Sequence, residues 1–502
     1  MQAYEYTDTQ VRKQARGAQR VDRGHVFCGG RSRSGTKYGL WPGARALPLA
    51  SRPWGWRTGR TRLPLDGLPA APSPVPLGLA GLGARAGRLV VSLPASERKH
   101  PLVAERQRSA TGRPHGGHLR VAGLFAGVGG IELGLHLAGH ETELLCEIEP
   151  AASRVLQQHF PGVPLLPDVR EIAQLPPVDV VAAGFPCQDL SQAGRTAGIK
   201  GQQSGLIGHV FRLLDSRRRG PRWLLLENVS FMLHLERGRA MRYLVDELEA
   251  RGFTWAYRIV DTRAFGLPQR RQRVIMLASR GDDPRDVLFT DDADPFDPAF
   301  SKDLWCGFYW TEGLRGLGWA VDAVPTVKGG STIGIPSPPA IWNPRARTIS
   351  TPEIRDAERL QGFDADWTLP ALDVPGVRRD HRWKLVGNAV SVPVSKWVGD
   401  RLSDPGCFDR RKSGELLPRG VAWPKAAWGH RGKVYAVNVS LWPVAVPTPH
   451  LADFLVYPRA PLSARAARGF INRADVSGLR FEDGFKDDVR EHIARMLRAE
   501  VA

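Results

Sequence analysis

The stretch 119–139, "LRVAGLFAGVGGIELGLHLAG", constrains the fold most, because it predicts a buried strand, a glycine turn and a helix in immediate succession. Gly127, Gly129 and Gly130 permit a tight turn and let a ligand approach the backbone closely. Glu147 ends a second predicted strand, where a carboxylate accepts hydrogen bonds from ribose hydroxyls. The spacing departs from GxGxxG, so it indicates a nucleoside-containing ligand, with a purely structural turn as the alternative.

Further apolar runs repeat this pattern along the chain. "TELLCEIEP", "VDVVAAG", "RWLLLENV" and "RVIMLAS" predict strands, and "AASRVLQQHF", "GLIGHVFRLLD" and "MRYLVDELEARG" predict helices between them. Strands that alternate with helices over about 160 residues favour an α/β fold with a doubly wound, mostly parallel sheet. Residues 282–343 are rich in Gly, Pro and Trp instead, which predicts a small, irregular inserted domain.

The net charge of +19 favours a polyanionic partner, but its distribution weakens the argument. Residues 1–117 hold 20 Lys/Arg against 6 Asp/Glu, a net +14, whereas residues 118–502 hold 50 against 45, a net +5. The segment 1–117 is rich in Arg, Gly, Pro and Ala and predicts little buried surface. A basic arm, a targeting segment and an over-extended gene model are its three interpretations, and the composition favours the third.

Cysteine usage and hydropathy indicate a cytoplasmic protein. No stretch approaches the roughly 20 apolar residues of a membrane span, and the first 25 residues lack the apolar core of a secretory signal. The five cysteines are odd in number and far apart, and none has metal-ligand spacing. We therefore expect reduced thiols, no membrane contact and no metal site.

Four later motifs occur in an order that is informative as a set. "GFPCQDLSQAGR" places Cys187 just past a buried strand, "LLLENVSFML" ends a strand on Glu227, "FGLPQRRQRVIML" carries Arg271 and Arg273, and "KLVGNAVSVP" closes the series. Taken alone, Cys187 is more often a small buried hydrophobe than a reagent. With "FAGVGG" before them, however, these motifs resemble the bacterial-type DNA (cytosine-5)-methyltransferases over residues 119–401.

The resemblance implies a Rossmann-like, S-adenosyl-L-methionine-dependent methyltransferase fold and a catalytic set. The Cys187 thiolate would add to cytosine C6, which makes C5 nucleophilic. Glu227 would stabilise the adduct at N3, and Arg273, with Arg271 nearby, would polarise the O2 carbonyl. For Arg271, a phosphate contact or a solvated charge run is an equally good interpretation. A mobile loop after Cys187 would close over a flipped base, with a plain solvent loop as the rival.

The same resemblance assigns cofactor residues one by one. Two departures weaken it: Gly123 stands where many relatives have an acid that meets the methionine amine, and Ile148 replaces a frequent aromatic. The residues expected to bind S-adenosyl-L-methionine are Phe125, Gly127, Gly129, Gly130, Glu147, Ile148, Asp168, Val169, Pro186, Leu206, Asn388 and Ala389.

Double-stranded DNA is the implied partner. Contacts are expected from Gln188, Ser191, Thr326 and Lys328, although a structural β-turn explains Thr326 and Lys328 equally well. The expected organisation is 1–117 N-terminal extension, 118–281 catalytic domain, 282–345 target-recognition region, 346–402 return to the catalytic domain, and 403–502 accessory region. The tryptophans of the 403–502 region, Trp423, Trp428 and Trp442, predict a small accessory core rather than a nucleic-acid surface.

Two other functions compete with this interpretation. An RNA cytosine-5 methyltransferase would use the same active site, and a catalytically silent DNA-binding relative would have no need of Cys187, Glu227 and Arg273 together. The intact set argues against silence, and a separate recognition segment argues for DNA over RNA. We expect a monomer that serves as the modification half of a restriction system, with a cognate endonuclease acting separately.

Overall fold

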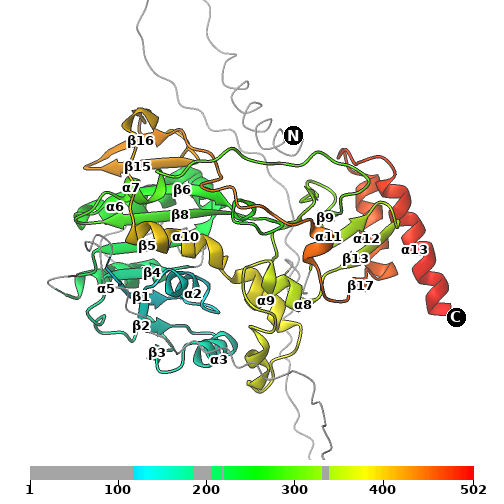
Figure 1. Ribbon diagram of the computed structural model, residues 1–502, viewed down its shortest axis with the longest axis horizontal. Coiled ribbons are helices and arrows are strands. Elements are labelled where there is room, and N and C mark those ends of the chain that lie inside the picture. The colour runs from blue at the N-terminus through cyan, green and yellow to red at the C-terminus, as the bar shows by residue number, and fades with distance from the viewer. Residues whose placement is uncertain (1–116, 186–204, 218–219, 331–337, 502) are drawn as a thin grey trace, which may run out of the picture. The chain divides into compact units, whose positions relative to one another are not determined.

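The computed structural model describes residues 117–185, 205–217, 220–330 and 338–501, apart from the side chain of the last one (Figure 1). They belong to one compact unit, Gly112–Ala502. The predictions for residues 1–116 and for Pro186, Cys187, Gln188 and Ser191 lie outside the described residues.

A ten-stranded sheet organises the catalytic part of the described chain. Its order is β14-β16-β15-β6-β8-β5-β4-β1-β2-β3. The strands from β5 to β3 pair in parallel, as the predicted alternation of strand and helix requires. They are β5 (Trp223–Val229), β4 (Val180–Ala183), β1 (Arg120–Leu124), β2 (Glu141–Cys146) and β3 (Leu165–Leu166).

The other half of this sheet is antiparallel. It contains β8 (Gln272–Ser279), β6 (Thr254–Asp261), β15 (Ala426–His430), β16 (Lys433–Val437) and β14 (Ser413–Leu416). The last three come from the region after residue 402, so that region extends the catalytic sheet. Trp423 and Trp442 are accordingly buried in the main core, and Trp428 packs partly against it.

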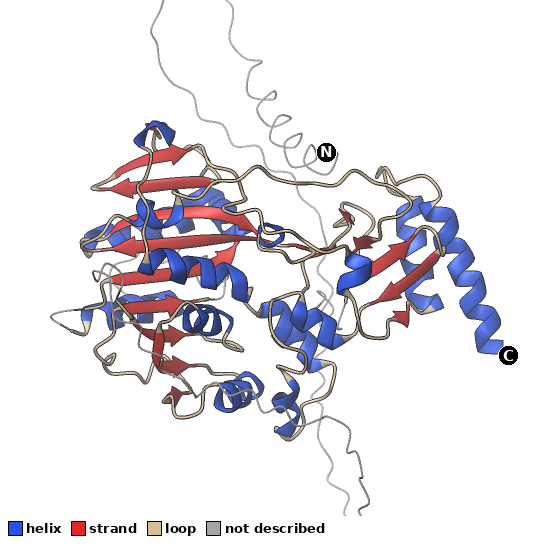
Figure 2. Cartoon of the chain, in the orientation of Figure 1, coloured by secondary structure: helices blue, strands red, loops and turns tan. Residues whose placement is uncertain are grey.

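Helices cover both faces of the sheet, as Figure 2 shows. In β6, Trp255 Nε1 donates to Glu249 of α6, whereas Arg258, on the opposite face, donates to the carbonyl oxygens of Leu288 and Asp291 by α7. α7 contacts α10, which contacts α2, while α5 meets α6 edge-on through aromatic rings. The layers are therefore α2 (Gly130–Leu137), α10 (Val392–Ser403) and α7 (Pro284–Leu288) against α5 (Leu206–Asp215) and α6 (Arg239–Ala250). This doubly wound, Rossmann-like arrangement confirms the predicted fold class.

A second, five-stranded sheet joins two distant parts of the sequence. Its order is β10-β9-β12-β13-β17, and β13 pairs antiparallel with β17. We call this sheet, with α12 and α13, the second lobe; Phe308 and Trp342 pack there against Phe470 and Phe485 in one buried cluster. Its elements are β9 (Cys306–Phe308), β10 (Ala320–Val321), β12 (Ala340–Asn343), β13 (Thr348–Thr351), β17 (Ala460–Pro461), α12 (Ala464–Asp475) and α13 (Phe485–Val501).

The remaining short elements connect these parts. A two-stranded parallel ladder joins β7 (Gln269–Arg270) to β11 (Val324–Pro325). The other helices are α3 (Pro150–His159), α8 (Ile354–Arg359), α9 (His381–Asn388), α11 (Leu451–Phe454) and the 3₁₀ turns η1 (Ser230–Gly238), η2 (Thr262–Ala264), η3 (Leu369–Asp373) and η4 (Arg410–Lys412).

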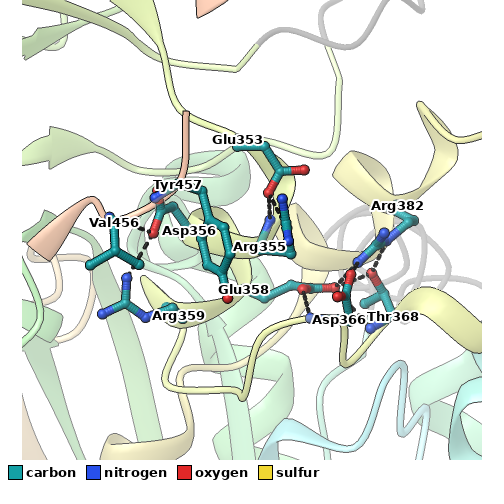
Figure 3. A network of polar contacts seen from close by, with 10 residues as sticks. All are labelled: Glu353, Arg355, Asp356, Glu358, Arg359, Asp366, Thr368, Arg382, Val456 and Tyr457. Atoms are coloured by element: carbon teal, nitrogen blue, oxygen red, sulfur yellow. Dashed lines mark hydrogen bonds and ion pairs between the residues drawn. The ribbon is translucent and has the colours of Figure 1, made fainter. Parts of the chain in front are cut away.

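Two buried carboxylates of α8 fasten the segments around it (Figure 3). Asp356 accepts hydrogen bonds from the backbone N–H groups of Val456 and Tyr457, which ties the C-terminal segment to α8. Glu358 accepts from the backbone N–H of Thr368 at 2.8 Å and from the Arg382 guanidinium of α9 at 2.9 Å. α8 thereby fixes α9, whose last residue belongs to the predicted site. Among the residues that the structure describes, no helix has the length and apolarity needed to cross a membrane.

Candidate active site

The glycine loop lies between β1 and α2, as predicted. Phe125 has a φ of +57°, which is strained for a residue with a side chain and marks a position that the surrounding fold imposes. Gly129 has a φ of +85°, and a Cβ on Gly130 would come within 2.2 Å of the Val390 carbonyl oxygen. The glycines therefore let the "GNAV" segment approach the start of α2.

Glu147 follows β2 at the same level as this loop, because Leu124 of β1 pairs with Cys146. Its carboxylate accepts hydrogen bonds from the backbone N–H groups of Gly127 and Glu149, each at 2.8 Å. Burial raises the pKa of Glu147, and these two N–H groups counteract part of that rise. The carboxylate is thus oriented at the loop, and each oxygen retains a lone pair for a ribose hydroxyl.

The other predicted cofactor residues lie along the same edge with different exposure. Asp168 follows β3 and is paired with Arg170 at 2.5 Å, which lowers its pKa to about 2, and Val169 is buried. Ile148 is 64% exposed and Leu206 begins α5 half-buried. Ile148 thus offers an open apolar surface beside Glu147.

Glu227, which is buried, and Arg273, whose side chain is 13% exposed, form a pair beside the end of β4. Ala183 pairs with Leu226, so Gly184 lies at the level of Glu227, whose Oε2 is 3.8 Å from an ideal Gly184 Cβ position. Arg273 Nε lies 3.0 Å from Glu227 Oε1, which is the distance of an ion pair. The angles between the two groups do not meet the geometry of a hydrogen bond. Burial raises the pKa of Glu227, although both Arg273 and Arg271 oppose the rise. A carboxyl that holds its proton to higher pH therefore lies beside Gly184, which precedes Cys187 by three positions in the sequence.

Asn228 is a site residue that the sequence reasoning missed. Its Nδ2 donates to the Phe185 carbonyl oxygen at 3.0 Å, and both residues are buried. The bond connects β5 to the backbone two residues before Cys187. The "ENV" motif contained the signal, since an amide beside a buried acid on an apolar strand requires a partner.

Arg271 is buried among backbone carbonyl groups, and its part in the reaction stays a prediction. It is 1% exposed, which makes the solvated charge run a wrong interpretation. Its guanidinium donates to the carbonyl oxygens of Val327 at 3.2 Å, Gly387 at 3.2 Å and Ala389 at 2.6 Å. The side chain therefore joins the "PTVKGG" loop to the end of α9.

The "PTVKGG" loop and the end of α9 are in backbone contact. A Cβ on Gly387 would lie 2.1 Å from the Gly329 nitrogen, so only glycine fits there. Ala389 is buried, and Asn388 is exposed with its Oδ1 against Gly329. Thr326 donates to the Arg270 carbonyl oxygen, and Lys328 pairs with Glu312 and lies 3.6 Å from the Tyr309 ring centroid.

Comparison with known proteins identifies the family. The model of the C-5 cytosine-specific DNA methylases matches residues 119–300. Type II methyltransferase M2.BsuMI of Bacillus subtilis (strain 168) is 49% identical over 389 residues, which cover 76% of this chain and 100% of that protein. The chain belongs to this family. Type II methyltransferase M.NlaX of Neisseria lactamica is 28% identical over 316 residues, covering 56% of this chain and 96% of that protein. The crystal structure of S. pombe Dnmt2 methyltransferase aligns with a TM-score of 0.42 and 17% identity over 57% of this chain and 98% of that one.

The family assignment confirms the predicted resemblance. The chain is a DNA (cytosine-5-)-methyltransferase, and S-adenosyl-L-methionine is its methyl donor. The residues of the methyltransferase fit that cofactor, because the glycine loop leaves backbone exposed to a ligand and Glu147 is already oriented beside it. A second carboxylate, Glu132, is buried under the loop without a hydrogen-bond donor among the described residues. A cofactor that carries positive charge suits such a site.

Proposed function

We propose that this methyltransferase modifies C5 of a flipped-out cytosine in a specific duplex DNA sequence, through a covalent bond between Cys187 Sγ and cytosine C6. The observation that carries the proposal is the pair of the buried Glu227 with Arg273 beside Gly184, at the sheet edge that also holds the glycine loop. In open α/β sheets, ligands bind outside the carboxyl ends of the strands.

The first step forms the Sγ–C6 bond and moves an electron pair onto the ring, which makes C5 enamine-like. Glu227, in its protonated form, donates to N3 and stabilises the adduct; its raised pKa supports this assignment. Arg273 directs positive charge at the O2 carbonyl. Once C5 has gained the methyl group, release of the C5 proton to water and departure of the thiolate restore the aromatic ring.

S-adenosyl-L-methionine, when bound, supplies an electrophilic methyl group for C5. We assign its methionine end to the glycine loop and Pro186, its ribose to Glu147, and its adenine to Ile148, Asp168 and Val169. Leu206, Asn388 and Ala389 complete the site. Exclusion of bulk water by Val390 and Ile131, whose methyl groups lie near Gly184, supports a shielded transfer.

We assign target recognition to the second lobe and the "PTVKGG" loop. Residues 451–501 complete the sheet and the hydrophobic core of the lobe. The predicted recognition region of 282–345 is short by itself, and these C-terminal residues enlarge it. Thr326 and Lys328 lie on the loop that Arg271 fastens to the end of α9, and Gln188 and Ser191 follow the nucleophile in sequence. We assign DNA contacts to these four residues.

The proposal extends to the role of the enzyme in the cell. We propose a monomeric cytoplasmic enzyme that protects DNA as the modification half of a restriction system, with the endonuclease acting separately. The "Type II methyltransferase" names of its relatives support this role.

Trapping with modified DNA tests the proposed mechanism. DNA that contains 5-fluorocytosine cannot lose its C5 substituent as a proton, so the adduct should persist and survive denaturing electrophoresis, with Cys187 at the cross-link. Active enzyme that forms no adduct would contradict the thiol mechanism. If the enzyme transferred labelled methyl groups to transfer RNA and not to DNA, the proposed DNA substrate would be wrong and the substrate would be RNA.

A further inference from the structure

Glu132, in the first turn of α2, is a charged residue that no part of the mechanism above uses. It is 1% exposed, and neither carboxylate oxygen has a hydrogen-bond partner among the described residues. Its Oε1 would lie 2.1 Å from a Cβ on Gly123, in the strand that leads into the glycine loop. The carboxylate therefore occupies the space that a side chain at position 123 would need.

Among the residues that the structure describes, no cation pairs with this carboxylate. Burial raises the pKa of Glu132 to about 8, Glu147 adds to the rise, and the backbone N–H of Glu132 itself opposes it. On α10, which packs against α2, Lys396 and Asp400 pair with each other at 2.8 Å. A buried acid that is neither paired nor hydrogen-bonded is costly, so it is protonated at neutral pH until a cation arrives.

We propose that Glu132 is the electrostatic partner of the α-ammonium group of bound S-adenosyl-L-methionine, positioned by the absence of a side chain at Gly123. The inference rests on the proposed cofactor site at the glycine loop. Of the two carboxylates there, the half-buried Glu147 already accepts two backbone N–H groups, whereas neither oxygen of the buried Glu132 accepts a hydrogen bond from another described residue. An ammonium group offers three donors and the positive charge that this acid lacks.

Two ligands separate this role from a structural one. S-adenosylhomocysteine carries the α-ammonium group, and 5′-methylthioadenosine shares its nucleoside but has no amino-acid part. Calorimetric titration of the full chain should show that Glu132→Gln weakens S-adenosylhomocysteine binding by about tenfold to a hundredfold, the range of a hydrogen bond to a charged group. Binding of 5′-methylthioadenosine should not change. Glu141→Gln, an exposed acid of β2 paired with His118, is the matched control and should affect neither ligand.

Moving the acid keeps the test independent of a folding defect. Gly123→Asp combined with Glu132→Ala should recover much of the lost affinity for S-adenosylhomocysteine, because the charge returns to the same space from the strand. Unchanged binding by Glu132→Gln, or an equal loss for both ligands, would overturn the inference while leaving the cofactor site intact. A wild-type chain that binds neither ligand would overturn the cofactor site as well.

Discussion

Replacement of Arg271 by Met tests whether this arginine acts on the reaction or on the structure. The variant keeps the length of the side chain and removes three hydrogen bonds, to Val327, Gly387 and Ala389. Each buried carbonyl that loses its donor costs roughly 1–3 kcal/mol, and removal of a buried cation returns part of this, so we expect a net loss of about 3 kcal/mol.

Thermal unfolding should register that loss as a fall in Tm of roughly 3–5 °C, because the unfolding entropy of a unit of this size is large. DNA affinity should fall about tenfold for every 1.4 kcal/mol of loop docking that is lost, since the "PTVKGG" loop no longer remains on α9. Arg239→Met, an exposed arginine on α6, should change the free energy of unfolding by less than about 0.5 kcal/mol. An unchanged Tm together with a slower methyl-transfer step in Arg271→Met would refute the structural role and restore the catalytic one predicted from the sequence.

Three further changes test other contacts. Glu227→Gln should slow methyl transfer. The raised pKa keeps the wild-type carboxyl protonated to higher pH, so the single-turnover rate of the wild type should fall only when this carboxyl loses its proton at high pH. The rate of the Gln variant should not show that fall. Asn228→Ala should lower kcat while S-adenosylhomocysteine binding persists, since the Phe185 carbonyl loses its donor; equal losses in both would contradict a local role. Truncation after residue 450 should abolish sequence-specific DNA binding and expose apolar surface to a fluorescent dye, because Phe308 and Trp342 lose their cover, and a soluble truncated chain with intact specificity would contradict the two-segment lobe.

The sequence predicted four of the five strands in the parallel half of the main sheet, because β1, β2, β4 and β5 lie in short apolar runs; the two-residue strand β3 was not predicted. The strand β6 was missed, since its central Arg258 reads as exposed although three backbone carbonyls hold it in the core. The pairing of β13 with β17 joins residues about 110 positions apart through two-residue contacts, which no local pattern reveals.

The site shows the same division between local and tertiary information. Glu147 and Glu227 were predictable because each ends an apolar strand, and parallel strands bring their carboxyl ends together. Arg271 and Arg273 look equivalent in "QRRQR", yet Arg271 donates to backbone carbonyl oxygens of two other segments, whereas Arg273 lies beside Glu227. The Glu132 carboxylate occupies the space beside Gly123 because α2 packs against β1. The spacing of the two residues in the sequence does not predict this contact.

Sequencing of methylated DNA from cells that express the chain tests the central claim most directly. We predict C5-methylcytosine in one fixed sequence context by bisulfite sequencing, and its disappearance when Cys187→Ser is expressed at the same level. Absence of new methylation with the wild type, or methylation that persists with Cys187→Ser, would contradict the proposed covalent methyl transfer.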